Sequence, residues 1–180
     1  MSQQARTVTV TAKQGGIFDV KSLVLLAILL AAGFILNMTL GNSLAIVGIK
    51  PQFIIAAYAL AIILTHASVA QSVLYAVISA CVIQLTTSIP GLNFLTGVVA
   101  AIAMSLLVNA NVGGQKACPL VSAFLTTLIS GALFAVLGTV IMGAALPTVM
   151  VKVPLVLGTA VFNSIIVQAL YIPLNKVLNK

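Results

Sequence analysis

Two lysines that are far apart in the sequence are the side chains best suited to bind a ligand. Lys50 directly precedes Pro51, and Lys152 stands shortly before Pro154, both in otherwise uncharged apolar sequence. Proline is tolerated at the first position of a helix, so each proline predicts a helix start with a lysine just outside it. At Lys50 the free backbone N–H groups of such a start would also favour an anion.

An acidic ligand is the natural partner of these lysines, because the chain itself has almost no acid to offer. Its single acidic residue is Asp19, near the N-terminus. A carboxylate on a small molecule would supply the charge-assisted hydrogen bonds that the chain does not. The alternative for Lys50 is an interfacial lysine whose ammonium reaches the lipid head groups.

Uncharged polar side chains gather near the ends of apolar runs on the same side as the two lysines. Polar groups are costly in hydrocarbon and usually face protein or a cavity, so the pattern predicts a polar pocket that opens on that side. Hydrogen bonds between helices are the alternative, favoured for the isolated serines and threonines. The residues predicted to bind a substrate are Lys50, Gln52, Asn42, Gln84, Thr87, Asn93, Lys152 and Asn163.

The composition excludes most catalytic chemistry. No Asp or Glu follows Asp19, so carboxylate acid–base catalysis and an intramembrane proton relay lack their groups. His66 stands alone in a predicted turn and makes neither a metal site nor a catalytic triad. No phosphate-binding loop motif is present, so the chain is not expected to hydrolyse ATP. We expect no enzymatic activity, no metal, no cofactor and no binding of nucleic acid.

The overall composition is that of an integral membrane protein. Of 180 residues, 62% are hydrophobic and 5% are charged, against roughly a quarter charged in soluble domains. The sequence predicts an all-α fold with a polar N-terminal segment, 1–21, and one membrane domain of six transmembrane helices, 22–180. The predicted spans are residues 22–40, 51–64, 69–85, 94–108, 119–146 and 154–174.

Two of these spans differ from the others in length. The second is short, so it must tilt little, thin the bilayer, or begin inside a cavity. The fifth is long and contains Gly131 and Gly138, and the sequence leaves open whether it breaks at either.

The basic residues predict the orientation of the chain. Six spans place both termini on one side of the membrane. An excess of basic residues marks the cytoplasmic side, so the termini are predicted to be cytoplasmic. The six on that side are Arg6, Lys13, Lys21, Lys116, Lys176 and Lys180, against Lys50 and Lys152 on the other.

The first span carries a further pattern. Ala27 and Ala31 are four residues apart, on one helix face, and small residues at this spacing let another helix approach closely.

The chain resembles the substrate-binding S-components of energy-coupling factor (ECF) transporters. The size, the six spans with cytoplasmic termini, and the Ala27–Ala31 pair are similar to that family. The segment from Gly48 to Pro51, together with residues 78–80, 86–91 and 93, looks like the tryptophan-type group of S-components. The likeness is most specific over residues 20–110.

The resemblance implies a multi-pass protein of the bacterial plasma membrane that takes up a vitamin-like or amino-acid-like solute from outside. Its partners would be a transmembrane coupling protein and two ATPase subunits, with Ala27 and Ala31 packing against the coupling protein. The tryptophan-type motif continues with an acid after Lys-Pro, whereas this chain has Gln52. This departure weakens tryptophan as the cargo and leaves an anionic or neutral vitamin precursor open.

Two other classes of function remain open from the sequence. One is a self-sufficient small channel or carrier that oligomerises through the glycine-containing fifth span. The other is a structural subunit of a membrane complex that binds no ligand. The absence of intramembrane acids argues against an ion-coupled carrier, and the two outer lysines argue against the structural subunit.

Overall fold

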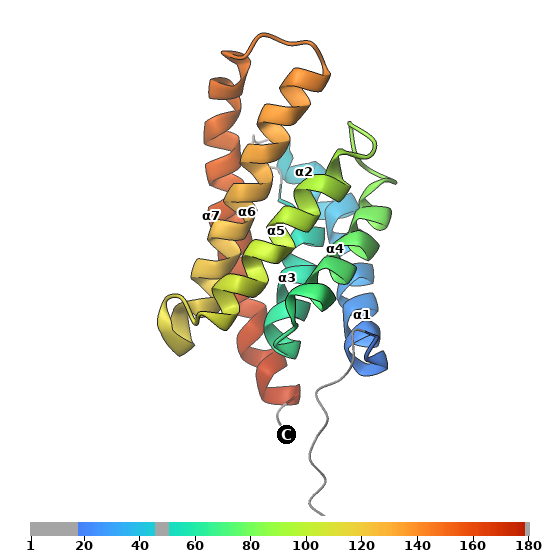
Figure 1. Cartoon of the computed structure of the whole chain (residues 1–180), viewed down its shortest axis with the longest axis vertical. Helices are drawn as coiled ribbons and strands as arrows, with labels where there is room; N and C mark the ends of the chain where they lie inside the picture. Colours follow the sequence, from blue (N-terminus) through green and yellow to red (C-terminus); the bar gives the residue numbers. More distant parts are fainter. Residues whose placement is uncertain (1–17, 46–50, 179–180) are drawn as a thin grey trace, which may run out of the picture.

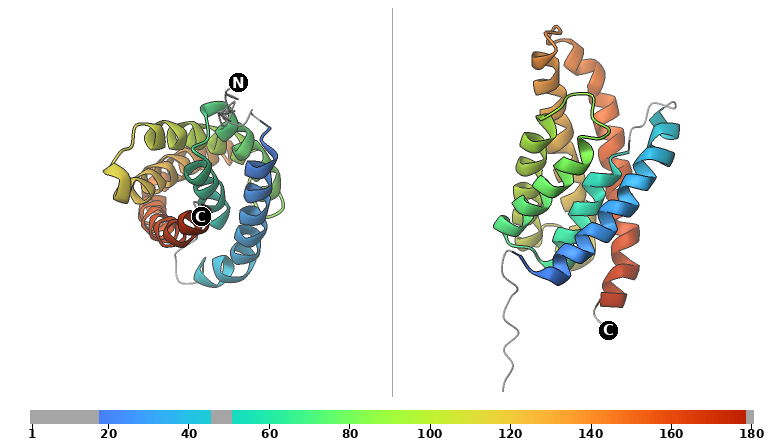
Figure 2. Two further views of the ribbon diagram at one scale, coloured as in Figure 1. Left: turned by 90° about the horizontal axis from the view of Figure 1, so that it is seen from below. Right: turned by 90° about the vertical axis from the view of Figure 1, so that its right-hand side faces the viewer.

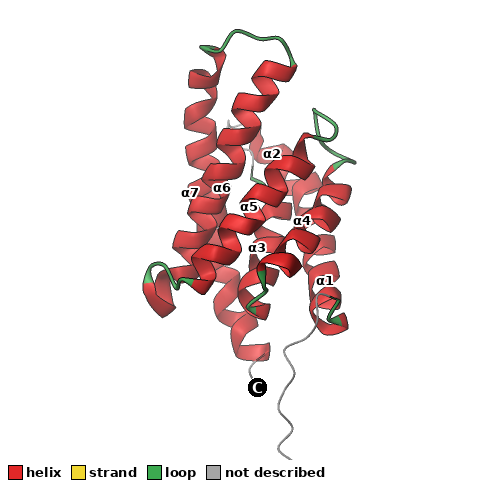
Figure 3. Cartoon of the chain, viewed as in Figure 1, coloured by secondary structure: helices red, strands yellow, loops and turns green. Residues whose placement is uncertain are grey.

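The described part of the chain is a bundle of helices without strands (Figures 1 and 3). The computed structural model describes residues 18–45 and 51–178. The elements are α1 (Val20–Leu36), a π-helical turn η1 (Asn37–Gly41), α2 (Asn42–Ala45), α3 (Phe53–Thr65), α4 (Val69–Ile83), α5 (Leu92–Asn109), α6 (Gly114–Ile141) and α7 (Thr148–Leu178).

Within residues 18–45 and 51–178, four segments are long and apolar enough to cross a membrane: Val20–Gly41, Leu92–Asn109, Lys116–Ile141 and Thr148–Leu178. Helices α3 and α4 are apolar but shorter, with 13 and 15 residues. The described part of the chain is all helical, and its several long apolar segments are those of a multi-pass membrane protein by length and composition. The all-α, membrane-type part of the predicted fold class is thereby confirmed.

Helix α3 is the central element of the bundle. It contacts α1, α4, α5, α6 and α7, and every residue from Phe53 to Ile63 is buried. Figure 2, left, shows α3 enclosed by the other helices. A helix that is apolar on all sides can be stable when neighbours cover its whole surface, which is the situation here.

The chain runs up and down between the two ends of the bundle (Figure 1). Helix α1 starts and α7 ends at the lower end of the view, and Lys21, Lys116 and Lys176 lie there, at the starts of α1 and α6 and the end of α7. The opposite end carries the α4–α5 loop, the start of α3 and the hairpin between α6 and α7. This hairpin rises beyond the other helices.

The three helix starts that were predicted from prolines differ from the prediction. Pro119 and Pro154 lie inside α6 and α7, which begin at Gly114 and Thr148, and α3 begins at Phe53 rather than at Pro51. Proline removes one intrahelical hydrogen bond, but in a membrane helix neighbouring groups can satisfy the freed carbonyl, so the helix can continue ahead of the proline.

The predicted fifth span is a single helix, α6. Helix α6 is unbroken through Gly131 and Gly138 and ends at Ile141, before the predicted end at residue 146. The chain leaves the helix through Gly143, whose φ of +64° lies in the left-handed region that glycine adopts without a steric penalty.

Candidate functional site

A cavity of about 290 Å³ lies among the helices at the upper end of the bundle in Figure 1. Its walls come from the end of α1, the start of α3, the α4–α5 loop, the start of α5 and the facing parts of α6 and α7. The volume is close to the lower end of the roughly 300–1,000 Å³ found for small-molecule sites. The lining residues are Asn37, Pro51, Gln52, Ile54, Ile83, Thr86, Thr87, Ser88, Asn93, Thr127, Gly131, Phe134, Ala135, Lys152, Leu155, Val156 and Thr159.

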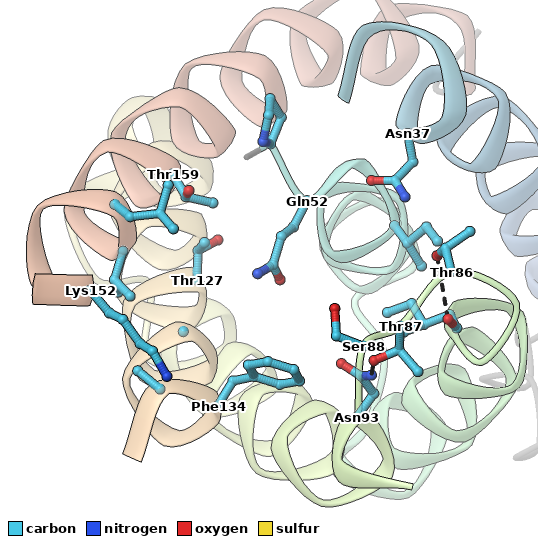
Figure 4. A pocket seen from close by; sticks show the side chains of 17 residues that line it. Asn37, Gln52, Thr86, Thr87, Ser88, Asn93, Thr127, Phe134, Lys152 and Thr159 are labelled. Atoms are coloured by element: carbon cyan, nitrogen blue, oxygen red, sulfur yellow. Dashed lines mark hydrogen bonds between the residues drawn. The ribbon is translucent and has the colours of Figure 1, made fainter. Parts of the chain in front are cut away.

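The cavity has two chemically different sides (Figure 4). One side is formed by α6 and α7 and carries Lys152, Phe134, Thr127 and Thr159. The opposite side carries uncharged hydroxyl and amide groups from η1, the α4–α5 loop and the start of α5. The side chain of Gln52 points into the space between the two sides.

Lys152 is held in place by the neighbouring helix. Its ammonium donates a hydrogen bond to Thr139 Oγ1 over 2.8 Å, and the Thr139 hydroxyl donates its own proton to the carbonyl oxygen of Ala135 over 2.6 Å. Thr139 is buried on α6, so this pair fixes the lysine head group against a packed helix. An ammonium has three N–H donors, and Lys152 has no other polar partner among the described residues.

No acidic side chain balances Lys152. The one acidic residue of the chain, Asp19, caps the start of α1 at the opposite end of the bundle. Hydrogen bonds from the Ser22 side chain and backbone hold the pKa of the Asp19 carboxyl below its usual range. Asp19 is therefore a local cap, and the cavity carries an uncompensated positive charge.

Hydrogen bonds among the residues of the uncharged side of the cavity hold their side chains in place. Asn93 Nδ2 donates to Thr87 Oγ1 over 2.6 Å, joining the start of α5 to the α4–α5 loop. The hydroxyl of Thr86 donates to the carbonyl oxygen of Ile83 over 3.3 Å. These contacts present amide and hydroxyl groups to a ligand without supplying any negative charge.

Asn163 fixes the backbone of Gln52, whose side chain points into the cavity. Its Oδ1 accepts from the Gln52 backbone N–H, and its Nδ2 donates to the Gln52 carbonyl oxygen, both over 3.2 Å. Asn163 is 0% exposed. This reciprocal pair ties α7 to the backbone that precedes α3. The Gln52 N–H, one of the groups expected to be free for an anion at the helix start beside Lys50, is used by Asn163 instead.

Four of the eight residues predicted to bind a substrate line the cavity together: Gln52, Thr87, Asn93 and Lys152. Asn163, also predicted to bind a substrate, does not line the cavity and instead pairs with the Gln52 backbone. Lys50 is outside the described residues, although its neighbour in the sequence, Pro51, lines the cavity, and the side chain of Asn42 is likewise not described.

The structure differs from two further predictions, one for Gln84 and one for the helix start near Lys152. Gln84 does not line the cavity, because its Oε1 accepts the Gly91 N–H over 3.1 Å and closes the α4–α5 loop. Lys152 was expected just outside a helix that starts at Pro154, whereas it lies within α7, one turn after the start.

Several lining residues are not among the eight predicted to bind a substrate: Asn37, Thr86, Ser88, Thr127, Phe134 and Thr159. The threonines and serine carry little signal, since such residues often satisfy themselves on their own helix, as Thr96 does with the Leu92 carbonyl. Phe134 carries none, because a phenylalanine in an apolar helix is ordinary.

Ala27 and Ala31 are both exposed on α1, as a surface that contacts another protein would require. The face of α1 that packs inward is different and includes Leu26, Leu30 and Gly33.

Comparison of the chain with protein-family models, with curated protein sequences and with solved structures finds no match in any of the three.

Proposed function

We propose that this chain is the substrate-binding subunit of an ECF-type importer. In this role it captures a small vitamin-like or amino-acid-like solute that carries a carboxylate, from outside the cell, for uptake driven by separate ATPases. The observation that carries the proposal is the cavity of about 290 Å³ with an uncompensated lysine on its wall. The choice of the ECF family in this proposal rests on the sequence resemblance to S-components described above.

The proposed topology has six helices across a bacterial plasma membrane and both termini in the cytoplasm. Helix α3 is too short to span the hydrocarbon alone, at about 20 Å for 13 residues. It starts at the cavity, where Pro51 and Gln52 face a polar space, and backbone that lines such a space is tolerated at membrane depth. Three basic residues, Lys21, Lys116 and Lys176, gather at the end where α1 starts and α7 ends, which favours that end as cytoplasmic.

A binding subunit suits this chain better than an enzyme or a self-energised pump. The cavity wall offers a cation, amides, hydroxyls and apolar side chains, which can hold a solute but include no carboxylate or histidine for proton transfer. Energy for uptake would come from partner subunits, since the sequence holds no phosphate-binding loop.

Native mass spectrometry of the gently solubilised protein tests the proposal. We expect a retained solute of a few hundred daltons, released at higher collision energy, and association with a coupling protein and two ATPases when they are co-expressed. A chain that retains no solute, binds none of a panel of vitamins, organic acids and amino acids, and forms a stable homo-oligomer would contradict the proposal. That outcome would favour a channel or a structural subunit.

A further inference from the structure

The charge pattern of the cavity restricts the solute more narrowly than its size does. Among the described lining residues, Lys152 is the one charged side chain. An anionic group on a ligand can meet its ammonium, where the hydrogen bond to Thr139 leaves further N–H donors available. Hydrogen bonds to a charged group are the stronger kind, so this contact would dominate orientation.

A ligand ammonium finds no comparable partner in the cavity. The chain has no acid besides Asp19, which is at the other end of the bundle. Amide and hydroxyl oxygens offer only partial charge, and burying an ammonium without a counter-charge is costly. The aromatic face of Phe134 could attract a cation, but Phe134 lies on the same side of the cavity as Lys152, which would repel it.

The remaining walls suit an uncharged body. Ile54, Ile83, Leu155 and Val156 supply apolar surface, while Gln52 and the Asn93–Thr87 pair can form hydrogen bonds to neutral polar groups. An acid with an apolar or neutral polar body would therefore have a matching partner on each wall of the cavity.

We propose that the cavity selects organic acids that lack an ammonium group, with the acid at Lys152 and the neutral body against Gln52 and Asn93. This inference rests on the proposed binding function and narrows it, because it excludes zwitterionic amino acids such as tryptophan as the preferred cargo.

The test uses sets of four probes built on one carbon skeleton: the acid, its α-amino acid, the corresponding amine and the acid's primary amide. Indole, phenyl, pyridine and linear aliphatic skeletons give four such sets. Binding to the wild-type protein in nanodiscs is measured by thermal shift and then by calorimetry. For any skeleton that binds, the acid should bind at least tenfold more tightly than the α-amino acid and the amine.

Tighter binding of the α-amino acid or the amine within a set would overturn the inference and leave the binding function intact. Failure of all sets, together with no retained solute in native mass spectrometry, would instead contradict the binding function itself. The two failures are thus distinguishable.

A charge-removing variant tests the placement of the acid. In Lys152→Met the preference for the acid over its amide should fall by roughly ten- to a hundredfold, the range expected for loss of a charged hydrogen bond. Lys152→Arg keeps the charge and should keep the preference. A Lys152→Met protein that melts cooperatively and still prefers the acid to the same degree as wild type would overturn the placement.

Discussion

Thr139 determines where the charge of the cavity lies, although it does not line the cavity itself. Its hydroxyl gives its proton to Ala135 and so presents a lone pair to the Lys152 ammonium. A lysine side chain has many rotamers, and ordering it costs conformational entropy. A buried partner that fixes the ammonium beforehand reduces the cost of that ordering when a ligand binds.

We predict that Thr139→Val weakens binding of an acid by about two- to tenfold, because valine has nearly the same shape but cannot accept from Lys152. Thr139→Ser, which restores the hydroxyl, should recover most of the affinity. Calorimetry with an acid identified in the probe sets measures both.

The matched control is Thr126→Val. Thr126 is equally buried on α6 but donates to the sulfur of Met104, away from the cavity. Its substitution should leave acid binding unchanged. Equal losses of affinity in Thr139→Val and Thr126→Val would show that the effect is one of packing rather than of lysine placement.

Residues of the site differ in how far sequence alone could identify them. Lys152 was identifiable because a lone charge in an apolar run requires an explanation. Thr139 was not, because its role depends on α6 and α7 pairing across a hairpin, and the spacing of apolar residues does not fix that pairing. Asn163 was predicted to bind a substrate, and only the packed structure shows that its partner is the Gln52 backbone.

At the scale of elements, the approach of α1 to α3 depends on a missing side chain. A Cβ on Gly33 would lie 2.9 Å from the Phe53 carbonyl oxygen and 3.2 Å from the Ala57 Cβ. The first contact is with backbone, which cannot rotate away, so the two helices would have to separate.

We predict that Gly33→Ala lowers stability by about 1–3 kcal/mol, the usual range for overpacking. Gly158→Ala on α7 is the control, since a Cβ there would meet no heavy atom within 4 Å and alanine improves helix propensity by about 1 kcal/mol. Thermal unfolding in detergent should show a lower melting temperature for the first variant and an equal or higher one for the second. Equal melting temperatures would mean that α1 is not held this closely against α3.

Helices α3 and α7 are joined by the Asn163–Gln52 pair rather than by apolar packing alone. We predict that Asn163→Leu destabilises the protein by about 1–3 kcal/mol for each backbone group of Gln52 that remains unsatisfied, and weakens ligand binding because Gln52 is no longer fixed.

Ser164→Ala is its neighbouring control, because Ser164 is also buried but donates to the Val161 carbonyl of its own helix. The melting temperature and the affinity for an acid are measured for both variants. The interpretation fails if Asn163→Leu melts and binds as Ser164→Ala does.

The helices themselves were largely predictable, and their ends were not. Apolar runs placed every long helix, since a segment in lipid must satisfy its backbone internally. Pro119 and Pro154 misled the prediction because an intramembrane helix can extend several residues ahead of a proline. Helix α3, the predicted second span, can be short because of its position. Other helices cover it on all sides and it begins at the cavity, so it does not need the length of a helix that crosses lipid.

Considered as a whole, the molecule separates the two surfaces that the proposed importer subunit would need. The cavity lies at one end of the bundle, between α3, α5, α6 and α7. The exposed face of α1 with Ala27 and Ala31 lies on the flank, and α1 contacts α3 and α4 but not α7. Ligand capture and partner contact should therefore be separable by substitution.

We predict that Ala27→Trp or Ala31→Trp blocks association with the coupling protein and its ATPases and abolishes uptake, while ligand affinity stays at the wild-type value. A bulky ring on this face would hold a partner helix away from the close approach that two alanines permit, and neither alanine lines the cavity. Co-purification from a strain that expresses all subunits, uptake of labelled solute and calorimetry provide the three readouts. Ala169→Trp, at an exposed alanine of α7, should leave all three unchanged. If the α1 variants assemble and transport normally, this face of α1 does not contact the coupling protein, whereas loss of assembly in Ala169→Trp as well would show that any added bulk on the flank is disruptive.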